Sequence, residues 1–307
     1  MKRNLFIFII LLFLLYLLIY PKDYVQAASM GLLLWYENIL PALLPFTICS
    51  NLLLSSGYID SMVQSGNSIW HKIFGRHSYA VYPIVAGFLF GFPLGSKITA
   101  DLWREHRLSD GEANVLCAMC NNISPAFVSS YLLLSSLKLT GMTLITYMIL
   151  YLPPFLLGMA LLHQQKANPP QKKSASKSNL NFQMIDAGIM NGFETMVKLG
   201  GYIMLFSLLV RMIARFANAN QWCCLLLTGL MEVTNGIHAV SLTALPIKYQ
   251  YMLAIAITSF GGLSGMAQTA SMSKGTACRM SFYLLFKAGQ TVFCTLAAYL
   301  AACIWLS

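Results

Sequence analysis

Nine apolar segments alternate with short polar stretches along the chain. They lie near residues 4–20, 33–56, 80–96, 114–135, 141–162, 192–213, 222–243, 250–272 and 281–306. A run of about 20 apolar residues is long enough to cross the hydrocarbon core of a bilayer as a helix. The pattern therefore predicts an all-α polytopic membrane protein.

One stretch, residues 163–181, interrupts this series with a polar, basic sequence that contains Pro169-Pro170 and no apolar period. We expect a flexible linker on the cytoplasmic side, where short basic loops are retained. The first apolar run follows two basic residues, so it is either a signal peptide or, as its length favours, a retained span. The predicted units are an N-terminal span with a short loop, a first repeat, the linker and a second repeat: 1–30, 31–162, 163–181 and 182–307.

The two repeats present the same features in the same order. Each has a span that opens near a glutamate, a segment interrupted by glycine, a span with a polar break, and a last span. Tyr36-Glu37 in the first repeat matches Phe193-Glu194 in the second. Internal similarity of this kind indicates a repeated architecture, which in membrane proteins is typical of transporters.

Lysine and arginine counts distinguish two topologies. If all nine segments cross, the basic residues of the loops divide nine inside and nine outside, without the usual cytoplasmic excess. If 80–96 and 222–243 instead dip in and return on the same side, the division becomes thirteen inside and five outside. Each half then has three crossings and one re-entrant or broken segment. Because three is odd, the halves become inverted repeats.

Composition agrees with a membrane protein, since hydrophobic residues make up 57% and charged residues 10% of the 307 residues. The net charge of +10 comes from basic residues in short loops, so it sets orientation and indicates no nucleic acid partner. The Cys117-x-x-Cys120 spacing lacks a second pair of ligands, so we expect neither a metal site nor a cofactor. The apolar composition makes the lipid bilayer an expected partner.

The stretch 87–103 (GFLFGFPLGSKITADLW) breaks a helix at bilayer depth through Gly91, Pro93, Gly95 and then Lys97. Proline removes a backbone donor, and glycine adopts angles that other residues avoid. Such a break is tolerated only where it faces a cavity or packed protein. We expect a turn whose N–H groups face an anion. The alternative is close helix packing at the glycines and a lysine that extends to the interface.

A second polar break lies deep in the span 114–135. Asn121, Asn122 and Ser124 precede Pro125, and Ser-Pro is a frequent helix start with serine as the N-cap. The matching place in the second repeat holds Gly261, Gly262, Ser264 and Gln268. We predict two pairs of half-helices whose breaks form a binding site. Hydrogen bonding between helices without a ligand is the alternative.

Ionisable residues within spans are costly, so each is a candidate for function. Glu194 and Lys198 are four residues apart, in the favourable order for an ion pair on one helix. Glu232 has no basic residue within one turn and precedes Thr234. We expect Glu232 or Glu194 to carry a coupling proton or cation, although pairing alone accounts for Glu194.

Enzyme motifs are not supported by the sequence. Residues 262–265 (GLSG) match the G-x-S-G of rhomboid-type intramembrane proteases, but no histidine follows His238 to serve as the base. No H-E-x-x-H, catalytic aspartate pair or Walker loop is present. We expect no enzymatic activity and no ATP-driven pumping.

Five blocks occur in an order that resembles one family. They are WYENILPALLPF (35–46), GFPLGSK (91–97), NNISPAF (121–127), Gly200-Gly201, and FGGLS (260–264) with Gln268. The chain resembles the sporulation integral membrane protein family of the nucleoside-recognition (Gate) superfamily, which includes a dipicolinate transporter of endospore formers. The resemblance covers most of the chain from about Gly31.

This resemblance implies a multi-pass protein of the bacterial cell membrane or forespore membrane that transports dipicolinate or a related small organic anion. Asn121, Asn122, Ser124, Gly261, Gly262, Ser264 and Gln268 are then expected around the substrate. Gly91, Pro93, Gly95 and Lys97 are expected to close one side. A nucleoside-type transporter and a non-transporting membrane scaffold are the alternatives, and the sequence leaves a homo-oligomer open.

Overall fold

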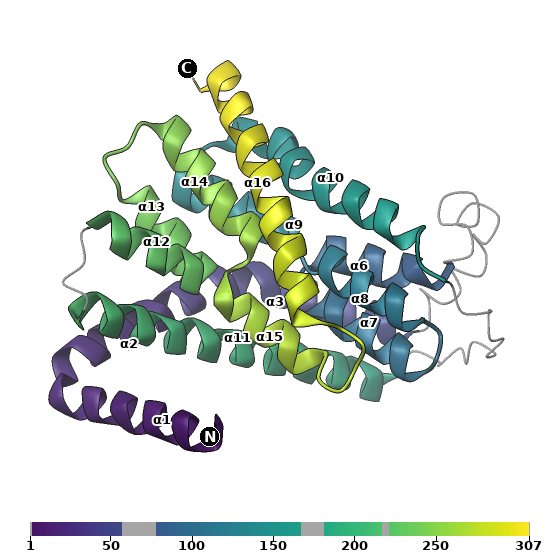
Figure 1. Cartoon of the computed structure of the whole chain (residues 1–307), viewed down its shortest axis with the longest axis horizontal. Coiled ribbons are helices and arrows are strands. Elements are labelled where there is room, and N and C mark those ends of the chain that lie inside the picture. The colour runs from purple at the N-terminus through teal and green to yellow at the C-terminus, as the bar shows by residue number, and fades with distance from the viewer. Residues whose placement is uncertain (1, 57–77, 167–180, 217–220, 307) are drawn as a thin grey trace.

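The computed structural model in Figure 1 describes residues 2–56, 78–166, 181–216 and 221–306. Within these ranges the regular elements are helices, and no strand occurs. Three helices are long and apolar enough to cross a membrane: Thr140–Leu162, Phe182–Arg215 and Met280–Trp305. A further pair, Ile10–Ile19 and Pro21–Glu37, passes the same test together but is bent by 106°. The predicted all-α polytopic membrane fold is confirmed.

The first half contains these elements: α1 (Lys2–Ile19), α2 (Pro21–Leu34), η1 (Trp35–Ile39), α3 (Leu40–Ser55), η2 (Ser78–Ala80), α6 (Val81–Phe90), α7 (Leu94–Arg104), α8 (Asp110–Met119), α9 (Pro125–Phe127), η3 (Val128–Leu137), η4 (Thr140–Met142) and α10 (Thr143–Leu162). The second half contains α11 (Phe182–Phe216), α12 (Gln221–Met231), α13 (Val233–Ser241), α14 (Ile247–Phe260), α15 (Gly262–Met272) and α16 (Met280–Trp305).

The two halves have the same order of elements. Each begins with a long helical segment, α2–η1–α3 in the first half and α11 in the second. A pair of short helices follows, α6 with α7 and α12 with α13, and the two members of each pair pack against each other. Next comes a helix interrupted near its middle, α8 to η3 and α14 to α15, and then a span, α10 and α16. Both predicted dips are helical hairpins, but the first is longer than the segment 80–96, because its second arm α7 continues to Arg104.

Contacts between the halves show that they run in opposite directions. Asp23 near the start of α2 pairs with Arg215 near the end of α11, whereas Asn51 near the end of α3 donates to the carbonyl of Gly188 near the start of α11. The start of α8 lies beside the segment after α15, because the Asn114 side chain accepts from the Arg279 amide. The two halves are therefore inverted repeats.

The N-terminal region packs on α11. Asp23, at the start of α2, forms ion pairs with Arg211 and Arg215, and the Arg215 guanidinium lies 3.9 Å from the centre of the Tyr20 ring. These contacts give a partner to Arg211 and Arg215, two of the five basic residues that the charge count placed outside. Helix α2 continues through residue 30, where the sequence analysis ended the N-terminal unit, and α1 extends along the lower edge of the bundle in Figure 1. Most of the linker 163–181 lies outside the described residues.

Glycines allow both hairpins to close tightly. In the first, Gly87 and Gly95 stand on either side of the turn and both face the carbonyl of Cys120, where a Cβ on either would overlap that group. In the second, a Cβ on Gly236 would lie 2.5 Å from the Cα of Gly229 in the opposite arm. Close backbone approach through small residues is the usual basis of tight helix packing in membranes. Gly87 and Gly95 thus allow the first hairpin to pack closely against Cys120, at the end of α8.

This packing predicts the effect of one added methyl group. Gly87→Ala should destabilise the fold by about 1–3 kcal/mol, because the new Cβ overlaps backbone that cannot move without displacing α8. Gly289→Ala on α16 is the matched control, since nothing lies within 4 Å of its added Cβ. Thermal unfolding in detergent measures both variants. Equal melting temperatures for the two would contradict the proposed packing.

Candidate functional site

Four short helices begin at the centre of the bundle. Their N-cap residues are Pro93 for α7, Ser124 for α9, Glu232 for α13 and Gly261 for α15. Two come from the hairpins and two from the interrupted helices, one of each kind per repeat. All four residues line two adjoining cavities. A helix N-terminus carries partial positive charge and free N–H groups, so the centre of the protein has several donor-rich ends.

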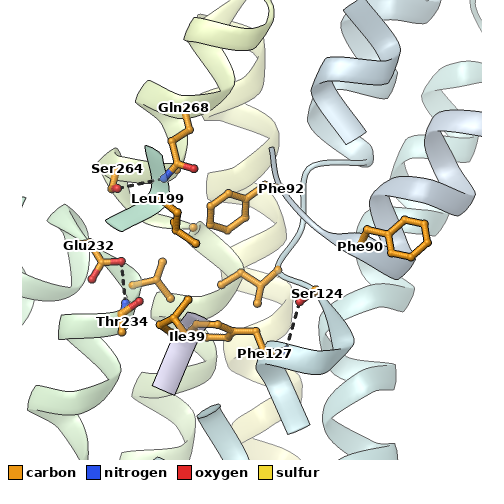
Figure 2. Close-up of a pocket in the computed structure, with 14 residues that line it drawn as sticks. Ile39, Phe90, Phe92, Ser124, Phe127, Leu199, Glu232, Thr234, Ser264 and Gln268 are labelled. Carbon is orange, nitrogen blue, oxygen red and sulfur yellow. Dashed lines mark hydrogen bonds between the residues drawn. The ribbon is translucent and has the colours of Figure 1, made fainter. Parts of the chain in front are cut away.

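Figure 2 shows the inner cavity, which has a volume of about 40 Å³ and mixes polar with apolar walls. Its polar side chains are those of Ser124, Glu232, Thr234, Ser264 and Gln268. Its apolar walls come from Ile39, Phe90, Phe92, Ile123, Phe127, Leu199 and Val233. A volume of this size holds a few water molecules and is too small for an aromatic ring. In this conformation the site therefore has no room for a ring-sized solute.

A path leads outward from the inner cavity. A second cavity of about 150 Å³ shares Phe90, Phe92, Ser124 and Leu199 with the first, and it adds Lys97 to its wall. A third cavity of about 310 Å³ also includes Lys97 and carries further charged side chains: Asp101, Glu105 and Arg107. The three cavities form a series in which polarity and charge increase away from the centre.

Phe92 lies between the first two cavities. Its amide donates to the carbonyl of Asn122 at 2.7 Å, so the tip of the first hairpin is bound to the break in α8–η3. A Cβ on Gly265 would meet the Phe92 ring at 3.6 Å, so the ring rests on α15 of the other repeat. Figure 2 shows Phe92 directed toward Leu199 and Gln268, while Phe90 points away from them. Phe92 thus separates the inner cavity from the outward path.

Glu232 caps the helix that it precedes, α13. Its carboxylate accepts from the amides of Thr234 at 3.0 Å and Asn235 at 2.8 Å, and from the Asn235 side chain at 3.0 Å. The side chain of Asn235 also donates to Ser207 on α11 at 2.6 Å. This contact separates the inner cavity from a fourth cavity of about 360 Å³ that contains Asn235, Ser207 and His238. The opposite route out of the centre is therefore closed.

Three tyrosine hydroxyls donate to carbonyls near the breaks. Tyr151 on α10 donates to the carbonyl of Ile123 at 2.7 Å, and Tyr147 donates to that of Pro125 at 3.1 Å. Tyr131 on η3 donates to the carbonyl of Thr234 at 2.9 Å and so joins the two repeats. Unpaired backbone groups are very costly in a membrane. These bonds allow the helices to stop at this depth.

Asn121 and Asn122 lie behind the cavity rather than in its wall. The Asn121 amide donates to Thr269 Oγ1 at 2.5 Å and to Tyr283 OH at 2.9 Å, which ties the first interrupted helix to α15 and α16. The Asn122 amide donates to the carbonyl of Met119 at 2.7 Å. Asn122 Oδ1 accepts from two residues of α16, which are considered below. Neither asparagine lines the two central cavities in this conformation, and their contact with a solute stays a prediction.

The other predicted residues fall into three groups. Ser124, Gly261, Ser264, Gln268 and Glu232 line the inner cavity, and Pro93, Lys97 and Glu194 line the second. Gly91 packs on Ser124, Gly95 on Cys120, and Gly262 on the turn before Glu232. Gly91, Gly261 and Gly262 have positive φ angles of 77°, 83° and 65°, which favour glycine.

The Glu194–Lys198 ion pair is present at 2.5 Å with both side chains more than half exposed.

The sequence analysis missed two kinds of residue. Phe92 and Leu199 line the site as apolar walls, and nothing in an apolar run marks such residues in advance. Lys287 and Gln290 on α16 bind Asn122 from behind. A lysine within a 26-residue apolar helix, at its eighth residue, was the signal that could have found this pair.

Comparison with known proteins gives one informative similarity. The chain is 25% identical over 324 aligned residues to "Sporulation integral membrane protein YlbJ" of Bacillus subtilis (strain 168). The alignment covers 93% of this chain and 78% of that protein. No family model matches the chain, and no solved structure matches it. Together with the long apolar helices, this similarity supports a multi-pass integral membrane protein.

The Asn121 contact yields a prediction about the core of the site. Thr269→Val should destabilise the protein by about 1–3 kcal/mol, because Asn121 loses a buried acceptor and a polar group is left unpaired. Thr269→Ser keeps the hydroxyl and should stay close to the wild type. Melting temperatures in one detergent provide the comparison. The assigned bond would be contradicted by a serine variant that falls as far as the valine variant.

Proposed function

We propose that this protein is a membrane transporter of a small organic anion, a flat dicarboxylate such as dipicolinate, and that it acts in sporulation. The convergence of four half-helix N-termini on two adjoining central cavities carries this proposal. Inverted repeats with interrupted helices that meet centrally form a recurrent transporter architecture. The relative whose name includes sporulation supports the cellular role.

The electrostatics of the cavity favour an anion. Glu232 is the carboxylate in the wall of the inner cavity, and the N–H groups of α13 already bind it. The N-termini of α7, α9 and α15 have no acidic cap, so their partial positive charges act on the cavity uncompensated. Ser264 and Gln268 supply neutral donors on α15. A carboxylate that enters this space meets donors on several sides.

Entry requires Phe92 to move. The inner cavity has a volume of about 40 Å³, whereas the second cavity beyond Phe92 offers about 150 Å³. Withdrawal of the Phe92 ring from Gly265 would join the two spaces into one chamber that admits an aromatic ring. Lys97 stands along the outer part of this route and adds a positive charge that draws anions inward.

A nucleoside-type solute is the second candidate, and Glu232 is the observation that favours it. Carboxylate and amide oxygens accept hydrogen bonds from sugar hydroxyls, and both Glu232 and Gln268 line the cavity. A non-transporting scaffold remains the third alternative, because packing alone also uses glycines and interhelical hydrogen bonds. Substrate flux distinguishes all three.

The test is uptake of labelled dipicolinate, with labelled uridine in parallel, by liposomes that contain the purified protein. We expect dipicolinate to enter, and Ser264→Ala to lower its rate at least about tenfold, as loss of a buried bond to a charged group predicts. Ser281→Ala is the matched control, because Ser281 is exposed on α16. Each variant is first checked for wild-type elution from a sizing column.

The outcomes separate the candidates. Uptake of uridine alone would move the assignment to a nucleoside-type transporter. Uptake of neither solute by folded protein would favour the scaffold. Dipicolinate uptake that is equal in Ser264→Ala and Ser281→Ala would keep the substrate but contradict this location of the site.

A further inference from the structure

Lys287 is buried in the first third of the 26-residue helix α16. Its side chain is 2% exposed, which is far below the values for the other lysine within a span, Lys198. Lys287 lies on the face of α16 that packs against the break of the first interrupted helix. A charged group at such a depth is costly, so its presence calls for a compensating role.

The partners of Lys287 are neutral. Its Nζ donates to Asn122 Oδ1 at 2.9 Å and to Gln290 Oε1 at 3.0 Å, and Gln290 donates to the same Asn122 oxygen at 3.1 Å. The centre of the Tyr283 ring lies 5.9 Å from Nζ. None of the ion pairs found among the described residues includes Lys287.

Among the described residues, no carboxylate forms an ion pair with Nζ. Helix α8, which packs on α16, has Asp110 and Glu112 in its first turn, and Glu112 accepts from the Ser109 amide. The titratable groups that face Nζ are three thiols and one phenol: Cys117, Cys120, Cys294 and Tyr283. Helix α10, which also packs on α16, carries no charged residue. The charged residue of helix α14 is Lys248, in its first turn. This turn lies near Tyr299, toward the other end of α16 from Lys287. Lys287 therefore lacks the fixed partner that would hold it in one protonation state.

The geometry accommodates both protonation states. A neutral amine has two N–H groups, and Asn122 and Gln290 provide an acceptor for each. An ammonium has three, and the third can be directed at the ring of Tyr283. A proton can therefore bind to or leave Nζ without a change of rotamer. The sequence-based coupling candidates differ, since Glu232 is held by three N–H donors and Glu194 is paired with Lys198.

Asn122 connects Lys287 to Phe92, the residue between the inner cavity and the outward path. Its side chain oxygen binds Nζ, and its backbone carbonyl accepts from the amide of Phe92. One residue thus separates the lysine from the aromatic ring that closes the inner cavity. A change of charge on Lys287 alters the hydrogen bonds at the residue that anchors the tip of the first hairpin.

We propose that Lys287 is the coupling site of the transporter, binding one proton per cycle and releasing it on the other side of the membrane. This proposal rests on the proposed transport function. In the step itself the ammonium gives its proton to water and Nζ keeps the electron pair. The amine later takes a proton from the opposite compartment, so nothing else is consumed. The proton and the organic anion then cross together.

The test uses liposomes that contain the full-length protein, with the membrane potential clamped at zero and labelled dipicolinate as the probe. Counterflow exchange measures transport itself. Accumulation driven by a pH gradient measures coupling, and one proton per solute supports about tenfold accumulation for one pH unit. The wild type should do both. Lys287→Met, which has no proton to exchange, should lose accumulation, and counterflow shows how much exchange remains.

A second variant tests the opposite state. Gln290→Glu is nearly isosteric and brings a carboxylate to Nζ, which holds the ammonium in place. It should also exchange without accumulating. Lys248→Met is the matched control, because Lys248 lies at the start of α14 outside the cavities described, and it should accumulate like the wild type.

Each outcome decides the proposal. Accumulation that persists in Lys287→Met or in Gln290→Glu overturns it. If Lys287→Met fails to fold, the Gln290→Glu result alone decides. A wild type that exchanges dipicolinate but ignores the pH gradient overturns the coupling proposal and leaves the transport function intact. A folded wild type with no exchange overturns the transport function and the coupling proposal together.

Discussion

Backbone hydrogen bonding in a medium without water is the constraint on which this structure depends. A helix that ends inside a bilayer must place its free carbonyl and amide groups against protein. Here four helices begin at the centre, and the exposed groups find partners in one another. The Phe92 amide meets the Asn122 carbonyl, three tyrosine hydroxyls cover carbonyls near the breaks, and the Glu232 carboxylate covers the start of α13. The polar cavity is the part of this centre where no protein group fills the remaining space.

The inverted repeats explain why the breaks meet at all. Because the two halves run in opposite directions, hairpins that enter from opposite faces bring their tips to a common depth. Tyr131 and Asn121 then link the repeats across the centre, one through a carbonyl of α13 and the other through Thr269 on α15. A movement of either hairpin therefore alters contacts in the other half. The first hairpin and the α16 lysine both contact Asn122 at this shared centre, through the Phe92 amide and through Nζ.

The sequence predicted the positions of the breaks better than the directions of the side chains around them. Glycine and proline at 91–95 and the Ser124-Pro125 start fix where helices end, because their effects are local. Asn121 and Asn122 lie within a non-helical stretch, so no helical period indicates which way they point. Phe92 becomes a wall only through contact with Gly265, 173 positions later in the chain. Such a contact depends on how the halves pack, which local patterns do not encode.

The length of the hairpin arms sets the electrical position of the central cavity. Helices α6 and α7 have 10 and 11 residues, and α12 and α13 have 11 and 9. At 1.5 Å per residue each arm extends about 15 Å, half of a hydrocarbon core of about 30 Å. A charge held at the tips has therefore crossed about half of the membrane voltage, or roughly 1.2 kcal/mol per elementary charge at 100 mV. A dianion bound there divides its passage into two electrical steps of similar size, so resting potential acts on its arrival and on its departure alike.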